Sequence, residues 1–413
     1  MSNKDDLHLA ISAAQDAFMK WNSKTIKARA AIMTQVHVLL LSEMDALVDL
    51  IVIENGKNRA EAKASVAKGI ETLEWAVSLP ASVSNKTLTV SRGITCSESR
   101  DALGIVASIV PFNFPAMVPM WTVPIALVCG NVMILKPSEK VPLTMNFMMS
   151  LFHKAGVPNG VFQIVHGTAS IVQDICAHPD IAAVTFVGSS KVAEIVASAC
   201  HASHKRVLAL GGAKNHLVAL PDADFEMAAS DIVASFAGCA GQRCMAASVL
   251  LLVGNEESMG KLVELVVAKA AALTRGTQAG QVGAIIDEAS QKRYVARYYL
   301  KHNLLFLSKI IVFLELLMLL KLKMGPRSSS MVEVGQRKNQ RDIGLVQPSY
   351  FIQVLTMQLF RLKSLVQCFL SCTSLPLLKL FALKMKICMV MQPVFTRPSE
   401  LMRNTFKHDS GLE

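Results

Sequence analysis

Hydrophobic positions recur at helical spacing over the first eighty residues of the chain. A second helical stretch runs from about residue 28 to residue 54 and ends at Asn55-Gly56, a typical C-cap; a third runs from about 59 to 77, before Pro80. Asp5 or Asp6 can cap the first helix. The buried face of that helix is expected to contain Leu7, Ile11, Ala14, Phe18 and Trp21.

From residue 104 onward, short apolar runs alternate with helical stretches. Strands are predicted over 104–110, 132–135, 161–165 and 182–187, with helices over 143–154 and 170–177. Strands that alternate with helices favour right-handed crossovers and a parallel sheet. The pattern therefore predicts an α/β fold.

Two of the predicted strands end in residues that can bind a ligand, and ligands bind at the carboxyl ends of such strands. Gly188-Ser189-Ser190 leads into a helix, where free N–H groups and a hydroxyl can hold a phosphate; a serine-rich helix cap explains it equally well. Lys136-Pro137-Ser138-Glu139 places a cation and an acceptor at the same edge, although a solvated loop has this composition too. The sequence contains no G-x-G-x-x-G fingerprint.

The segment 238–245 places Arg243 directly before Cys244, among small residues. A neighbouring cation favours the thiolate, which is the nucleophilic form of cysteine. An isolated cysteine is more often an inert apolar side chain, and Cys239 is expected to be one.

Charge and cysteine usage exclude several classes of protein. The net charge of +11 is concentrated in residues 301–413, which hold 16 Lys and Arg against 6 Asp and Glu, without a pattern that fits nucleic acid. Nine cysteines without C-x-x-C spacing indicate a reducing compartment and no zinc or other metal site. The cytoplasm is expected, or the mitochondrial matrix in a eukaryote.

Six motifs together resemble the aldehyde dehydrogenase superfamily, and within it the coenzyme A-acylating methylmalonate-semialdehyde (malonate-semialdehyde) dehydrogenases. They are IENGK (53–57), PFNFP (111–115), GNVMILKPSE (130–139), FVGSS (186–190), LGGAKNH (210–216) and AGQRCMA (240–246). The resemblance implies a Rossmann-type, parallel-sheet NAD-binding domain over 1–210, with an oligomerisation segment near 82–102. It also implies a partial α/β catalytic domain over 211–300.

The resemblance assigns roles residue by residue. Cys244 matches the nucleophile that forms a thioester, and Asn113, with the Cys244 N–H, matches the oxyanion hole. Positions that bind NAD are matched by Val110, Phe112, Lys136, Glu139, Lys140, Ser189 and Gly211.

Hydrolytic members of the superfamily carry a glutamate where this chain has Ala209. Without that base, coenzyme A is a better acyl acceptor than water. The expected substrates are malonate or methylmalonate semialdehyde, giving acetyl-CoA or propionyl-CoA, as in valine or inositol catabolism. Arg243 is a candidate for binding the carboxylate, and Lys68 stands where the family usually has arginine; surface solvation explains Lys68 equally well.

The resemblance stops at about residue 298, and relative to the family the chain is also short at its start. Back-translating residues 331–348, 362–370 and 384–397 and reading from the third codon position permits GRGWAKKEPKGYWFGPT, EIFGPVLS and NENMYGNAACIYT, which resemble the missing half of the family. We infer a frame shift that begins between about 293 and 318. The segment 304–320 looks like a marginal membrane span, but a membrane helix is not expected there.

A shifted frame has consequences for function. It predicts that residues 301–413 form an aberrant, poorly ordered tail, that turnover is impaired or lost, and that the family's homo-oligomer is incomplete. The partners expected are a small semialdehyde and coenzyme A, with no nucleic acid and no membrane. The alternative is a catalytically dead remnant that at most binds nucleotide.

Overall fold

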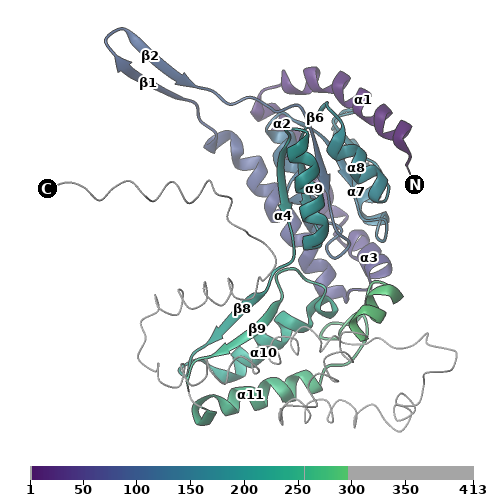
Figure 1. Cartoon of the computed structure of the whole chain (residues 1–413), viewed down its shortest axis with the longest axis vertical. Coiled ribbons are helices and arrows are strands. Elements are labelled where there is room, and N and C mark those ends of the chain that lie inside the picture. The colour runs from purple at the N-terminus through teal and green to yellow at the C-terminus, as the bar shows by residue number, and fades with distance from the viewer. Residues whose placement is uncertain (1, 255, 296–413) are drawn as a thin grey trace.

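The computed structural model describes residues 2–254 and 256–295 (Figure 1). The tail predicted over 301–413, its segment 304–320 and the three segments for which a frame shift is inferred lie outside these residues. Within the described part of the chain, no helix is long and apolar enough to cross a membrane.

Four helices precede the sheets: α1 (Lys4–Asn22), α2 (Ile26–Ser42), α3 (Met44–Asn55) and α4 (Arg59–Ser82). The predicted cap of α1 was wrong, because Asn3 is the N-cap and forms a reciprocal capping box with Asp6. The predicted helix over 28–54 is two helices, divided at Glu43, where ψ is 16°. Gly56, with φ 78°, ends α3 in the left-handed conformation as expected. Helix α4 continues through Pro80, because the packing of its buried face outweighs the one backbone hydrogen bond that proline removes.

A five-stranded sheet of order β5-β4-β3-β6-β7 forms the centre of the fold, and every pair in it is parallel. The strands are β3 (Ile105–Ile109), β4 (Val132–Lys136), β5 (Phe162–Ile164), β6 (Ile181–Val187) and β7 (Arg206–Leu210). The helices between them are α5 (Met117–Met120), α6 (Val123–Val128), α7 (Leu143–Lys154), α8 (Ala169–Ala177) and α9 (Ser190–Ala202). The predicted parallel α/β sheet is confirmed.

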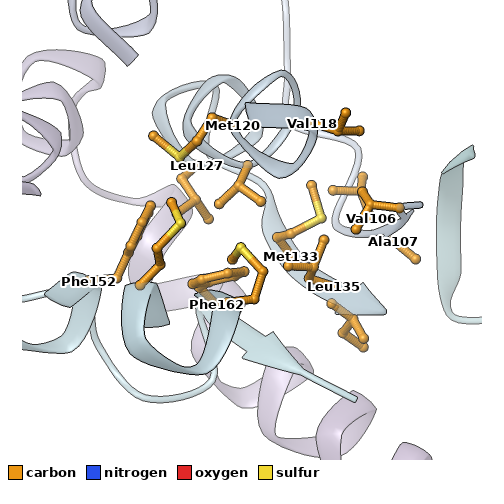
Figure 2. Close-up of a cluster of buried hydrophobic side chains, with 14 of the residues drawn as sticks. Val106, Ala107, Val118, Met120, Leu127, Met133, Leu135, Phe152 and Phe162 are labelled. Carbon is orange, nitrogen blue, oxygen red and sulfur yellow. The ribbon is translucent and has the colours of Figure 1, made fainter. Parts of the chain in front are cut away.

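The two central strands β3 and β4 are buried at every residue, as expected for a parallel sheet covered on both faces. Figure 2 shows Met133 and Leu135 of β4 directed into a cluster with side chains of α6 and α7. In this cluster the rings of Phe152 and Phe162 lie 5.0 Å apart between centroids. The indole Nε1 of Trp21 donates to the carbonyl of Leu127 at 3.0 Å and so links α1 to the end of α6.

A smaller unit follows the five-stranded sheet. Strands β8 (Asn215–Ala219) and β9 (Ala247–Leu252) form a parallel pair, and α10 (Phe225–Ala237), a 3-10 turn over Gly238–Gly241 and α11 (Glu256–Ala271) accompany them. These elements have a hydrophobic core of their own, which includes Ile232, Phe236 and Leu262.

One element projects from the body. Strands β1 (Lys86–Ser91) and β2 (Ile94–Glu98) pair antiparallel in a hairpin that extends away from the rest of the structure (Figure 1). Every residue of both strands is exposed, including Leu88, Val90 and Ile94.

Candidate active site

The strand order reverses between β3 and β6, so that the connections leaving these two strands run in opposite directions across the sheet. Such a switch point opens a crevice at the carboxyl ends of the strands. Val110, which is buried, follows β3 there, and its N–H donates to the carbonyl of Lys136 at 3.1 Å. Two motifs noted in the sequence, PFNFP and FVGSS, therefore meet at this edge.

Ser189 is the N-cap of α9, and its side chain makes no capping hydrogen bond. The next residue, Ser190, accepts a hydrogen bond from the N–H of Gly212 at 2.9 Å through its hydroxyl. A Cβ at Gly211 would lie 3.0 Å from the Cα and Oγ of Ser190, so the backbone after β7 approaches the start of α9 closely. The start of α9 thus offers a hydroxyl that does not cap the helix, beside a helix N-terminus, an arrangement suited to a phosphate.

Lys136 ends β4 and is almost fully buried, and its Nζ donates to Glu139 Oε2 at 2.9 Å. Burial alone would raise the pKa of Glu139. Its own backbone N–H and the Lys136 ammonium outweigh that effect, so the pKa lies below its ordinary value. The pair forms an ionised acceptor beside a cation at the sheet edge.

Lys140 forms an ion pair with Asp287, which was not predicted from the sequence. Its ammonium pairs with Asp287 and lies 5.3 Å from the centroid of the Phe112 ring. Burial would raise the pKa of Asp287, but hydrogen bonds from Lys140 and Ser290 lower it to about 2. Lys140 therefore ties the loop after β4 to the segment that follows α11.

The nucleophile candidate Cys244 is half-buried and lies in a turn between α10 and β9. Just before it, Cys239 and Ala240 both adopt left-handed conformations, with φ 52° and 54°. Each such non-glycine residue costs about 1–2 kcal/mol, so surrounding contacts must hold the turn in place.

Asn113 reaches this turn from the sheet edge. Its Nδ2 donates to the carbonyl of Gln242 at 2.8 Å, across 129 residues of sequence. Its Oδ1 is buried without a hydrogen-bond partner among the described residues. The structure thus places the predicted oxyanion donor against the loop that carries Cys244, with one amide hydrogen still available.

Asn215, which was not predicted as a site residue, holds the backbone of the loop that carries Cys244. Its Nδ2 donates to the carbonyls of Cys244 at 2.7 Å and Ala246 at 3.1 Å. Gly212 contacts Ser190 at the start of α9, and Asn215 contacts the loop that carries Cys244. Residues 212–215 therefore connect the candidate phosphate site at the start of α9 to that loop. The motif LGGAKNH contained this residue, but sequence alone does not show which group an asparagine contacts.

Lys57 and Glu61 were missed as well, although Lys57 lies in the motif IENGK. Glu61 accepts the Cys239 N–H with both carboxylate oxygens, at 3.0 and 3.1 Å. The Lys57 ammonium is buried and lies 3.6 Å from the centroid of the Phe114 ring. Burial lowers the pKa of Lys57, against the opposing influence of Cys239 and Glu61.

Cys239 differs from Cys244 in its surroundings. Burial raises the pKa of the Cys239 thiol to about 11, although the Lys57 ammonium acts in the opposite direction. Cys239 therefore stays protonated near pH 7, in agreement with the expectation that it is an inert packing residue.

The two predicted carboxylate-binding cations have different surroundings. The Arg243 side chain is half-buried and folds back on Gly238, where a Cβ would lie 2.5 Å from its Nη1. Lys68 is 65% exposed and pairs with Glu71 on the same helix at 2.7 Å. Ala209, at the position of the hydrolytic base, pairs in register with Phe186 on β6.

Comparison with known proteins gives the family. The model of the aldehyde dehydrogenase family matches residues 1–302. The chain belongs to the aldehyde dehydrogenase family. Among curated relatives, malonate-semialdehyde dehydrogenase 1 of Geobacillus thermodenitrificans is 40% identical over 299 residues, covering 71% of this chain and 61% of the relative. Malonate-semialdehyde dehydrogenase of Halalkalibacterium halodurans is 43% identical over 269 residues, covering 64% and 56%.

Solved structures agree with this assignment. A methylmalonate-semialdehyde dehydrogenase of Oceanimonas doudoroffii is 35% identical with a TM-score of 0.70, over 72% of this aldehyde dehydrogenase chain and 62% of the other. A protein of Sinorhizobium meliloti assigned to the same activity, in complex with NAD, is 34% identical with a TM-score of 0.70, over 72% and 61%. The chain thus spans about three fifths of the length of these relatives.

Proposed function

We propose that this aldehyde dehydrogenase oxidises malonate or methylmalonate semialdehyde with NAD and coenzyme A, through a thioester on Cys244. The products are acetyl-CoA or propionyl-CoA, with the substrate carboxylate lost as CO2. The observation that carries the proposal is the contact between the Asn113 amide and the loop of Cys244.

The residues at the sheet edge suit NAD. Ser189 offers a hydroxyl with no capping bond at the start of α9, and a Cβ at Gly211 would crowd Ser190 at 3.0 Å. Lys136 provides a donor and Glu139 an ionised acceptor for ribose hydroxyls, and Lys140 adds a cation. Val110 and Phe112 are the residues that we propose to line the cofactor site. When bound, NAD supplies the acceptor for the hydride that is lost from the substrate carbon.

The chemistry at the nucleophile uses the chain's own groups. The Cys244 thiolate attacks the aldehyde carbon, and the developing oxyanion receives hydrogen bonds from the Asn113 amide and the Cys244 N–H. Loss of hydride from this thiohemiacetal leaves a thioester. Each donor of such a hole contributes about 3 kcal/mol to stabilising the transition state.

Two further features fit the proposed reaction, one for the acyl acceptor and one for the substrate carboxylate. Ala209 offers no carboxylate to activate water, so a thiol is the better acceptor for the acyl group. Arg243 beside the nucleophile provides a cation for the carboxylate of a 3-oxo acid, and Lys68 on α4 is a second candidate.

The decisive experiment incubates the purified full chain with malonate semialdehyde and NAD, with and without coenzyme A. Absorbance follows NADH, and mass spectrometry separates acyl-CoA from free acid. Cys244→Ser is expected to abolish both products, whereas Cys96→Ser, in the exposed hairpin, is the matched control.

The outcomes separate the alternatives. Acyl-CoA with NADH supports the proposal, and free acid with NADH identifies a hydrolytic enzyme instead. The frame shift inferred for the tail predicts impaired or lost turnover. Slow formation of acyl-CoA therefore supports both the proposed reaction and the inferred frame shift, whereas sustained NADH production with acyl-CoA supports the reaction and contradicts the frame shift.

A second candidate is a protein that binds nucleotide without turnover. This candidate is supported by the apolar side chains that β7 and β8 expose, because a catalytic domain that is incompletely formed leaves such surface uncovered. Leu208, Leu210 and Val218 are 54%, 41% and 45% exposed. If neither product forms, calorimetric titration with NAD tests this candidate directly.

Assembly is a separate proposal. We propose that residues 1–210 form the cofactor-binding domain, that 211–300 belong to the catalytic domain, and that the hairpin near 82–102 pairs with a second copy of the chain. The exposed strand edges and the apolar Leu88, Val90 and Ile94 support this assignment. Light scattering on Leu88→Asp is expected to show a lower mass than the unmodified chain.

A further inference from the structure

The turn before Cys244 requires support from outside the loop. Cys239 and Ala240 are two consecutive non-glycine residues in the left-handed region. Such a backbone persists only where neighbouring groups determine it. Finding the group that holds this turn therefore identifies what sets the position of the nucleophile.

Glu61 is in a position to do so. Both of its carboxylate oxygens lie within 3.1 Å of the Cys239 nitrogen, 178 residues away in sequence. Its own backbone is fixed, because the Glu61 N–H donates to the N-cap Asn58 Oδ1 at 2.8 Å. The carboxylate therefore extends from the rigid first turn of α4 onto the loop.

The charges around the turn also depend on Glu61. Lys57 Nζ is buried and has no hydrogen-bond partner among the described residues, and Arg243 Nη1 lies against Gly238. A Cβ built on Gly238 would lie 3.3 Å from Glu61 Oε1 and 2.5 Å from Arg243 Nη1, so the carboxylate and the guanidinium both border Gly238. Without Glu61, Lys57 and Arg243 would be two like charges beside a strained backbone.

The effect of Glu61 extends to the reactive centre through short contacts. The Cys239 carbonyl accepts the N–H of Gln242 at 3.0 Å and its Nε2 at 3.1 Å. The carbonyl of the same Gln242 accepts the Asn113 amide. A change of backbone angle at Cys239 therefore moves Gln242 relative to Asn113 and shifts Cys244, two residues further on.

We propose that Glu61 is a positioning residue for Cys244: its carboxylate holds the left-handed turn at Cys239-Ala240 and thereby sets the path of the nucleophile loop. The proposal rests on the proposed function only in treating Cys244 as the nucleophile.

The test measures the loop without requiring turnover. The full chain is treated with iodoacetamide, and mass spectrometry follows labelling of Cys244 relative to the exposed Cys96 in the same molecule. In Glu61→Ala the released loop exposes Cys244, and its relative labelling rate rises at least about tenfold, as expected for losing a charge-assisted hydrogen bond. Glu61→Gln keeps an acceptor oxygen and is expected to restore most of the original rate. Glu74→Ala, an exposed acidic position on the same helix, is the matched control and leaves the rate unchanged.

The buried cysteines report on folding in the same experiment. Cys176 and Cys200 are almost fully buried and are expected to stay unlabelled in all variants. The proposal is overturned if Glu61→Ala labels Cys244 within twofold of the unmodified chain. It is equally overturned if both Glu61 variants expose Cys176 and Cys200, because Glu61 then stabilises the whole fold. Absence of acyl-CoA in the turnover assay would refute the proposed function and leave this result unaffected.

Discussion

The centre of the five-stranded sheet and the β8-β9 pair are held together by different means. Strands β3 and β4 are buried at every residue, whereas β8 and β9 mix buried and half-exposed positions. Near β8 and β9, the loop of Cys244 is held by Asn215 at the start of β8 and by two side chains from more distant elements, Glu61 and Asn113. Packing therefore fixes the edge where the cofactor is proposed to bind, and polar contacts fix the loop of Cys244, the proposed nucleophile.

The turn before Cys244 lies at the junction of these two regions. Cys239 packs in the larger core and Ala240 in the smaller one. Adjacent residues with left-handed backbones thus belong to different cores, and this is where the strain is located. The position of Cys244, the proposed nucleophile, therefore depends on how the two cores meet at this turn.

The largest effect is expected from a substitution in the buried strands of the five-stranded sheet. Leu135→Ala, at a fully buried position of β4, is expected to lower the free energy of unfolding by about 2–5 kcal/mol, because it removes a core side chain and leaves a cavity. Val218→Ala on β8 is expected to cost less than about 1 kcal/mol, because that side chain is 45% exposed. Urea denaturation measures both, and equal costs would show that the two sheets do not differ as described.

The second prediction concerns a polar contact of the loop. Asn113→Ala is expected to slow acylation of Cys244 by p-nitrophenyl acetate about 100-fold, because the oxyanion loses a donor. The release of p-nitrophenolate in stopped flow gives the rate. Asn146→Ala, an exposed asparagine on α7, is the control. An unchanged rate in Asn113→Ala would remove Asn113 from the proposed oxyanion hole.

A smaller change tests the placement of Arg243. Gly238→Ala introduces a Cβ 2.5 Å from Arg243 Nη1 and displaces the guanidinium. The concentration of malonate semialdehyde that half-protects Cys244 from iodoacetamide is expected to rise about fivefold, because a charge-assisted contact weakens. Protection by propanal, which has no carboxylate, should stay the same. Equal shifts for both aldehydes would mean that Arg243 does not bind the carboxylate.

The smallest expected effect probes the ion pair between Asp287 and Lys140. The folded-state pKa of Asp287, about 2, lies below its ordinary value of 3.8, so the native state binds this proton more weakly than the unfolded chain does. The stabilisation is present above about pH 4 and is lost as the pH falls toward 2. The difference in thermal midpoint between the unmodified chain and Asp287→Asn should therefore shrink over that range. A difference that is constant with pH would contradict the assignment.

The parallel sheet could be predicted from the sequence because its strands are continuous apolar runs between helical stretches. The end of α3 was predictable as well, since Gly56 has the positive φ that glycine tolerates. The first cap and the break at Glu43 were not, because several polar residues near each point could have served. Of the predicted site residues, Asn113 contacts the loop of Cys244, while the roles assigned to them stay predictions. Asn215, Lys57 and Glu61 were not predicted, because their residue types and positions are equally typical of a structural role.

By itself, the sequence determined the α/β sheet and the set of motifs that identify the aldehyde dehydrogenase family, because hydrophobic period and local turn chemistry act over short distances. Only the tertiary structure decided that the Asn113 amide, the Glu61 carboxylate and the Asn215 side chain converge on one loop. Those contacts join residues 129, 178 and 29 positions apart. No local pattern encodes such distances, since they follow from how helices and strands pack around two separate cores.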